Sequence, residues 1–301
     1  MLFTYLKLLL TAMFWGGTFI SGRMLADSVT PFCAAFLRFL IAAMCLYAVA
    51  IRRYGTIPRL ERNQILPVVL LGLTGVFAYN AFFFNGLKLI TAGRASIIIA
   101  NNPIVISALA VLFFGEALSP VNLFGILISV IGAVIAISGG DPLSLFAGGV
   151  GKGDFFIFGC VLSWSSYSLL GKRVVRHLSP LLATSHAAAV GTVALFIPAC
   201  MEGMFGALPT YSWKDWGNLA YLGLFGTVLG FVWYYEGIRA IGPARASLFI
   251  NFVPISAILL AYLILNEPLS PSLLVGAVLV VTGVTLNQLP LSGWRPVVRN
   301  G

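Results

Sequence analysis

Charged residues are scarce in this sequence. Only 9% of its 301 residues are Asp, Glu, Lys or Arg, and it contains 9 acidic residues and 2 histidines. A soluble globular domain carries about 25% charged residues. Because so few charges cannot cover the water-facing surface of a chain this long, the composition excludes a soluble enzyme and a disordered protein. Ten membrane spans of roughly 20 residues each would leave no room for a separate soluble domain.

Metal ligands and catalytic groups are equally sparse. The sequence contains no Gly-rich phosphate loop, no HExxH motif and no Ser/His/Asp group. We therefore predict no metal, no cofactor, no catalytic residue and no pump driven by nucleotide hydrolysis. No basic run is interleaved with polar surface, so we expect no nucleic-acid partner despite the net charge of +9. The cysteines, which lack metal or disulfide spacing and are expected in helices, are Cys33, Cys45, Cys160 and Cys200.

Long apolar runs dominate the sequence, with 59% hydrophobic residues and a mean hydropathy of +0.99. Ser119-Pro120 and Ser270-Pro271 are typical helix starts, with Ser as the cap and Pro in the first turn. We expect the first run to be a helix and not a removed signal peptide, because no small-residue cleavage site is visible. The ten predicted spans are Tyr5–Ser21, Pro31–Ile51, Gln64–Phe84, Ala92–Phe114, Pro120–Ser138, Asp154–Leu170, Pro180–Cys200, Trp213–Tyr235, Pro243–Leu265 and Ser270–Leu289.

Basic residues are distributed unevenly between the two predicted membrane faces. With the N-terminus inside, twelve Lys and Arg lie in inner segments, five lie in outer loops, and Arg38 lies within a span. Basic residues accumulate in cytoplasmic loops. We therefore predict a multi-pass protein in the lipid bilayer, with its N- and C-termini in the cytoplasm.

The chain matches itself at a shift of 151 residues. Gly86–Gly132 aligns without a gap on Gly237–Gly283, with 19 identities in 47 positions, and a weaker match at a shift of 149 places Trp15 on Trp164. Because five spans is an odd number, the second copy enters the membrane the other way up. The sequence thus predicts an all-α integral membrane protein of ten transmembrane helices in two inverted five-helix repeats. The repeats cover residues 1–140 and 152–290, a cytoplasmic tail covers 291–301, and we expect a monomer because one chain supplies both repeats.

Two short motifs occur once in each repeat. GRASIIIANNPI (93–104) matches ARASLFINFVPI (244–255), and GEALSP (115–120) matches NEPLSP (266–271). This pattern, with the five-plus-five layout, resembles the EamA-type drug/metabolite transporter superfamily over nearly the whole chain. The resemblance implies an inner-membrane carrier, often an exporter of amino acids or related metabolites. The similar four-span multidrug pumps use an acidic residue in their first helix, and its absence here disfavours export of cationic drugs by glutamate–proton exchange.

Aromatic and polar side chains within the spans are the candidate substrate-binding residues. Trp15 and Trp164 lie mid-span, away from the headgroup belt, and form either an aromatic pocket wall or packing between helices. Tyr79 and Asn80 are expected to face the central cavity. The complete predicted set is Trp15, Tyr79, Asn80, Phe83, Asn101, Trp164, Tyr234, Asn251 and Arg38.

Charged and amide groups inside a membrane are costly unless they are paired. Arg38 either binds a substrate carboxylate or extends to the headgroups. His186, its near counterpart in the second repeat, either carries a proton or packs with a hydrogen bond. Asn101 and Asn251 either bind substrate or hydrogen-bond between helices.

Pro103 and Pro254 occupy matching positions that are predicted to fall mid-helix. Each would kink its helix and act either as a hinge or as a static packing feature. Glu116 and Glu267 are predicted at the ends of the fourth and ninth spans, where they either gate through salt bridges or pair as ordinary terminal charges.

These features favour secondary transport of a small metabolite such as an amino acid. We expect alternating access around a midplane cavity, with export as the direction. Amides and aromatics without an acid favour a neutral or zwitterionic substrate over a cation. Two alternatives remain open, namely an intramembrane enzyme acting on lipid and a non-transporting membrane sensor.

Overall fold

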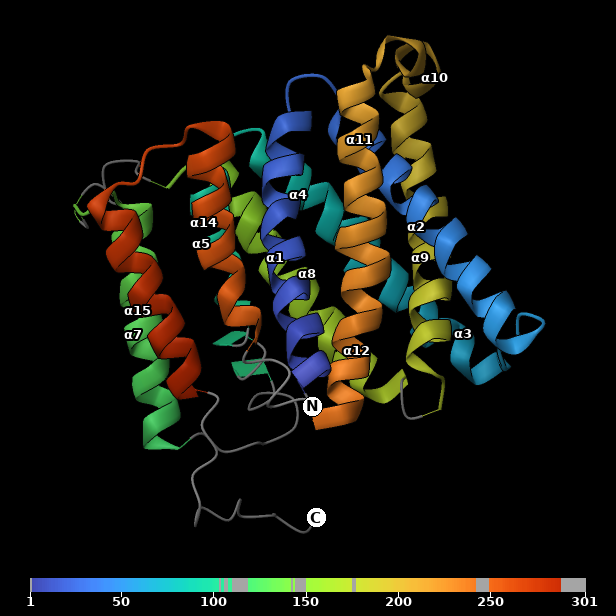
Figure 1. Ribbon diagram of the computed structural model, residues 1–301, viewed down its shortest axis with the longest axis horizontal. Coiled ribbons are helices and arrows are strands. Elements are labelled where there is room, and N and C mark those ends of the chain that lie inside the picture. Colours follow the sequence, from blue (N-terminus) through green and yellow to red (C-terminus); the bar gives the residue numbers. More distant parts are fainter. Residues whose placement is uncertain are drawn as a thin grey trace.

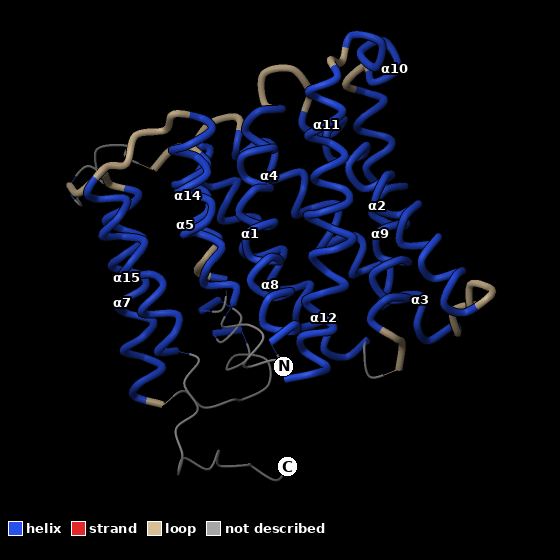
Figure 2. The backbone as a smooth tube through the Cα atoms, in the orientation of Figure 1, coloured by secondary structure: helices blue, strands red, loops and turns tan. Residues whose placement is uncertain are grey.

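The described part of the protein is a bundle of helices (Figures 1 and 2). The computed structural model describes residues 2–102, 104–105, 108–109, 119–141, 143, 150–174, 177–241 and 249–287, which contain no strand. Six helices in these ranges are long and apolar enough to cross a membrane, and two more apolar helices are shorter. Each predicted span overlaps a described helix, while the number of ten crossings stays a prediction.

The helix starts recur at the spacing of the sequence repeat. The first half contains α1 (Leu2–Leu25), α2 (Pro31–Tyr54), α3 (Arg62–Leu71), η1 (Gly72–Ala78), α4 (Tyr79–Leu87), α5 (Ala92–Ile99) and α7 (Pro120–Ile137). The second half contains α8 (Lys152–Val174), α9 (Pro180–Met201), α10 (Met204–Ala207), η3 (Leu208–Thr210), α11 (Trp213–Tyr221), η4 (Leu222–Leu229), α12 (Gly230–Ile241), η5 (Phe249–Asn251), α14 (Phe252–Leu265) and α15 (Pro271–Asn287). The starts of α3 and α11, of α4 and α12, and of α7 and α15 are each 151 residues apart.

Side-chain caps explain why several helices begin where they do. Ser119 accepts a hydrogen bond from the backbone N–H of Asn122 and is followed by Pro120, so the helix start predicted there is confirmed. Ser270 accepts from the backbone N–H of Leu273 at 3.2 Å and caps α15 in the same way. These caps satisfy N–H groups that have no partner in the first turn of a helix.

Two wide turns interrupt long helices at matching positions. The π-helical segment η1 joins α3 to α4, and η4 joins α11 to α12, with starts 150 residues apart. A π turn closes hydrogen bonds over five residues and is frequent at functional sites. Within η4, the Thr227 hydroxyl donates to the carbonyl of Leu222, five residues earlier, at 3.0 Å.

Helices α7 and α15 pack against each other through glycine. A Cβ atom on Gly132 would lie 2.7 Å from the carbonyl oxygen of Gly276, and one on Gly283 would lie 2.5 Å from that of Gly125. Gly125 and Gly276 are repeat partners, as are Gly132 and Gly283. Each contact is therefore the repeat image of the other, and the two helices run antiparallel, as equivalent helices of inverted repeats do.

Helix α1 lies at the centre of the bundle. It contacts α4 and α5 of its own half and α11, η4, α12 and α14 of the other half. Large apolar side chains cover the outside, where Leu127, Val193 and Val278 are 60%, 71% and 65% exposed. A surface of this kind suits a lipid environment. The buried side chains of α1 therefore lie between the two halves, whereas Leu9 and Met13 of the same helix are 36% and 47% exposed and join the apolar exterior.

Candidate substrate site

The two repeat-related tryptophans contact the same phenylalanine. Trp15 on α1 and Trp164 on α8 lie with ring centroids 5.8 and 5.7 Å from that of Phe231 on α12. Tyr234 lies 5.3 Å from Trp15, and Tyr79 lies 5.6 Å from Trp164. These are separations at which aromatic rings attract one another. We call these five residues the aromatic cluster, and it contains rings from both halves of the chain.

Trp15 also forms a hydrogen bond to the π turn. Its indole N–H donates to the carbonyl of Gly226 in η4 at 2.9 Å. A Cβ atom on Gly226 would lie 2.6 Å from the Thr18 methyl carbon, and one on Gly230 would lie 2.6 Å from the Trp15 indole nitrogen. Glycine at these two positions therefore allows the close approach of α1 to the second half.

Arg38 of α2 lies inside the bundle, with 6% of its surface exposed. Its Nη1 donates to the amide oxygen of Asn80 at 3.1 Å, and its Nε and Nη2 both lie 3.4 Å from the Thr227 hydroxyl oxygen. Asn80 is 1% exposed. A Cβ atom on Gly226 would lie 3.6 Å from Arg38 Nη2, so the guanidinium lies close to the Trp15 hydrogen bond. Arg38 therefore connects both π-helical regions beside the aromatic cluster.

Seven of the nine predicted substrate-binding residues are brought together here. Phe83 joins the aromatic cluster through Tyr79, at a centroid separation of 5.8 Å. Two amides lie elsewhere. Asn101 accepts from the Ser129 hydroxyl at 2.8 Å, and Asn251 donates to the Thr285 hydroxyl at 2.9 Å. Asn101 thus connects the end of α5 to α7, and Asn251 connects η5 to α15. Asn251 also lines a separate pocket of about 250 Å³ with the exposed residues Phe252 and Ile255.

Of the two predicted hinge prolines, Pro254 lies within the described residues. Pro254 is the third residue of α14, directly after the 3-10 turn η5, and not in the middle of a helix. Its missing N–H belongs to a first turn, where that group has no intrahelical partner. Pro103 and Glu116 lie outside the described residues. His186 accepts or donates a 3.0 Å hydrogen bond with Tyr47 and lies apart from the aromatic cluster.

Carboxylates of the second half tie it to the first half. All five acidic residues in 152–287 bond to a group of the first half. Four of them lie at the starts of α8 and α11 or at the ends of α9 and α14, on what we call the far face, opposite the N-terminus and at the top of Figure 1, and the fifth lies in α12. Asp154 bonds to Arg94, Glu202 to the backbone N–H groups of Phe32 and Cys33, Asp215 to Ser28, Glu267 to the N–H groups of Ala92 and Gly93, and, at the N-terminal face, Glu236 to Lys7.

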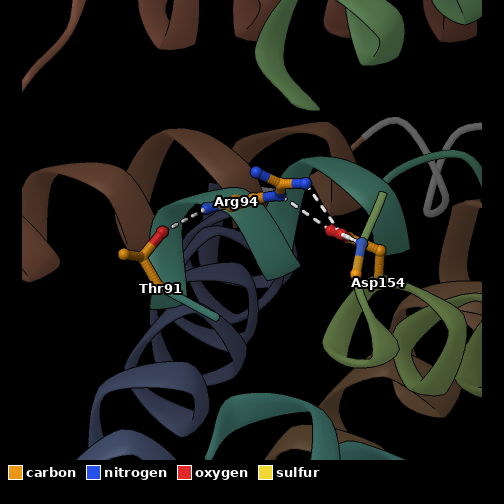
Figure 3. A network of polar contacts seen from close by, with 4 residues as sticks. Thr91, Arg94 and Asp154 are labelled. Atoms are coloured by element: carbon orange, nitrogen blue, oxygen red, sulfur yellow. Dashed lines mark hydrogen bonds and ion pairs between the residues drawn. The ribbon is translucent and has the colours of Figure 1, made fainter. Parts of the chain in front are cut away.

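The strongest of these ties is the two-pronged pair of Arg94 and Asp154 (Figure 3). Arg94 Nε and Nη2 each lie 2.7 Å from an Asp154 oxygen, and the Asp154 side chain is 1% exposed. Thr91 caps the same helix by accepting from the Arg94 backbone N–H. Glu267 accepts from the first N–H groups of α5 at 3.0 and 3.2 Å, where the helix dipole favours a negative charge. Burial, reinforced by nearby Cys33 and Glu202, raises the pKa of Tyr211 at this face.

Thr227 and Phe231 are site residues that the sequence analysis missed. At the repeat shift of 151, Phe231 corresponds to Asn80 and Thr227 to Val76. Applying that shift to Asn80 would have pointed to Phe231. Thr227 lacks such a signal because its repeat partner is apolar and its role depends on the π turn.

The comparisons with known proteins place the chain in a family. The EamA-like transporter family matches it twice, over residues 2–138 and 151–288. The chain therefore belongs to the EamA-like transporter family, a family of membrane proteins, which confirms the resemblance drawn from the repeated motifs. It is 29% identical to the uncharacterized transporter YyaM of Bacillus subtilis, over 93% of this chain and 92% of that protein.

Other relatives extend the comparison. An uncharacterized transporter of Archaeoglobus fulgidus is 31% identical, over 94% of this chain and 96% of that protein. A protein of Streptantibioticus cattleyicolor named a probable terminal-alkyne amino-acid exporter is 30% identical, over 93% of this chain and 91% of that protein. A solved crystal structure aligns with a TM-score of 0.63 over 93% of this chain and 98% of that chain. At 20% identity, that likeness shows a shared fold.

Proposed function

We propose that this protein is a secondary transporter that carries a small metabolite, such as an amino acid, out of the cell by alternating access. The observation that supports it best is the composition of the aromatic cluster, in which repeat-related Trp15 and Trp164 meet on Phe231. Inverted-repeat transporters bind substrate between their repeats near the membrane midplane. The relative named as an amino-acid exporter supports the substrate class.

The unequal ties between the halves support a state closed at the far face. Among the residues that the structure describes, four carboxylates of the second half bond to the first half there, and one, Glu236, bonds to Lys7 at the N-terminal face. We assign the far face to the outside of the inner membrane and both termini to the cytoplasm, because basic residues favour the cytoplasmic side. One chain supplies both halves, so the proposed transporter is a monomer.

The test is efflux from proteoliposomes preloaded with labelled amino acids, with and without a pH gradient. We expect selective release of one class of amino acid in chemically unchanged form. Dependence on the pH gradient would indicate proton coupling, and independence would indicate facilitated diffusion. Release no faster than from protein-free liposomes with the same load would contradict amino-acid transport. A chemically altered solute or lipid would favour the enzyme alternative, and binding without flux would favour the sensor.

Two asparagine variants on one helix sharpen this test. Asn80 and Asn85 on α4 each donate to the carbonyl four residues earlier, at 2.7 and 2.8 Å, but only Asn80 accepts from Arg38. A hydrogen bond to a charged group contributes about 1.5–3 kcal/mol. We expect Asn80→Ala to reduce the efflux rate about tenfold or more, and Asn85→Ala to leave it near the wild-type rate. Equal rates in the two variants would contradict a role for Asn80 in the transport path.

A further inference from the structure

Arg38 is a buried cation whose described partners are all neutral. Its three donating contacts go to the Asn80 amide and the Thr227 hydroxyl, and its side chain is 6% exposed. Within the described ranges, the two salt bridges are Lys7–Glu236 and Arg94–Asp154, neither of which involves Arg38. An ionised group removed from water is costly unless an opposite charge compensates it. Among the described residues, no carboxylate bonds to Arg38 to compensate its charge.

The neutral partners are held in place by the two halves. The Asn80 amide nitrogen donates to the Val76 carbonyl in η1 at 2.7 Å, which turns the amide oxygen toward Arg38. The Thr227 hydroxyl donates to the Leu222 carbonyl in η4, which leaves its oxygen to accept from Arg38. A guanidinium has five N–H donors, and these contacts engage three. Two N–H groups of a fixed guanidinium thus remain without an acceptor among the described residues.

Aromatic rings lie near these donors. Gly226 adjoins Arg38 Nη2 and also accepts from the Trp15 indole, so the guanidinium and the aromatic cluster share one backbone segment. A molecule with a carboxylate at one end and an apolar body would contact both. A guanidinium binds a carboxylate through two parallel hydrogen bonds, whereas it repels an ammonium group.

We propose that Arg38 binds the carboxylate of the transported molecule, and that the substrates are therefore carboxylate-bearing molecules, zwitterionic or monoanionic, with an apolar body. This inference rests on the proposed transport function and names its substrate class. Amines and uncharged amides of the same shape are excluded as good substrates, because they leave the charge of Arg38 uncompensated.

The experiment compares matched probes on the purified full-length protein by thermal stabilisation and by proteoliposome efflux. The probe sets are L-phenylalanine, L-phenylalaninamide and phenethylamine, L-leucine and L-leucinamide, and benzoate and benzamide. We expect a carboxylate of at least one set to stabilise the protein and be released, with its amide and amine counterparts inactive. Arg38→Gln should abolish the stabilisation. Arg38→Lys should keep the preference for carboxylates but raise the half-saturating concentration about tenfold, because the positive charge remains while the two parallel hydrogen bonds of the guanidinium are lost.

Arg23→Gln is the matched control, since Arg23 on α1 also donates to a neutral acceptor, the Leu87 carbonyl, at 2.6 Å. It should keep the wild-type preference. Stabilisation by no carboxylate, equal stabilisation by amides, or an unchanged preference in folded Arg38→Gln would overturn the proposal. If Arg38→Gln does not fold, unchanged carboxylate affinity in Arg38→Lys would overturn it. Flux of amides or amines without carboxylate binding would contradict carboxylate binding by Arg38 but support the transport function. Carboxylate binding without flux would support the role of Arg38 but contradict the transport function.

Discussion

Trp15 joins α1 to the second half through one N–H group as well as through its ring. The Gly226 carbonyl that accepts this hydrogen bond lies in a π turn. Trp164, its repeat partner, contacts the same Phe231 ring but makes no indole hydrogen bond to the described residues. The two tryptophans therefore contribute similar ring packing and different polar contacts.

Replacing each tryptophan by phenylalanine separates these contributions. Trp15→Phe keeps an aromatic ring but leaves the Gly226 carbonyl without its indole donor, which costs about 1–3 kcal/mol for a buried group. We expect Trp15→Phe to lower the midpoint of thermal unfolding in detergent by several degrees more than Trp164→Phe. Equal midpoints in the two variants would show that the indole hydrogen bond does not stabilise the fold.

At the level of single residues, the sequence predicted part of the candidate site. The repeat alignment paired Trp15 with Trp164 because both positions hold the same residue type. At the shift of 151, Phe231 could have been inferred as the repeat partner of Asn80, whereas Thr227, whose partner Val76 is apolar, carried no such signal. A contact between two residues far apart in the chain depends on how the halves pack, and a single sequence does not contain that information.

Glycine allows helices α7 and α15 to pack closely, and alanine substitution tests this contact. A Cβ atom on Gly276 would lie 2.6 Å from the Gly132 carbonyl oxygen and 2.7 Å from the Ala136 Cβ atom, so the helices would have to separate. A Cβ atom on Gly217, in α11, would have no neighbouring atom within 4 Å. We expect Gly276→Ala to lower the thermal midpoint and Gly217→Ala to raise it slightly, since alanine favours a helix by about 1 kcal/mol over glycine. A stabilising Gly276→Ala would refute the close packing.

Helix positions were more predictable than their internal irregularities. Apolar runs and Ser-Pro pairs indicated the starts of α7 and α15, because the cap and the first turn are local features. The π segments η1 and η4 escaped prediction, since their residues are ordinary for a membrane helix and the wide turn is decided by contacts. The same limit applies to Pro254, whose 3-10 turn upstream left it at a helix start.

The contacts between the two halves at the far face are a property of the whole molecule. Glu267 holds the first N–H groups of α5, and Glu61 caps α3 within its own half. We expect Glu267→Ala to accelerate hydrogen exchange in residues 92–99 about tenfold, because a charge-assisted hydrogen bond is lost. Glu61→Ala should leave that segment unchanged. Unaltered exchange in Glu267→Ala, measured by mass spectrometry in detergent, would show that this carboxylate does not hold the two halves together.

The five carboxylate contacts make the halves chemically unlike where they meet. In these five contacts the first half supplies the donors, namely backbone N–H groups, a hydroxyl, a lysine and an arginine, and the second half supplies the carboxylate acceptors. Two copies of the second half would bring carboxylates together and repel, and two copies of the first would leave donors facing donors. These five contacts therefore favour the pairing of two unlike halves over the pairing of two like ones, although the helix starts of the two halves recur at the repeat spacing.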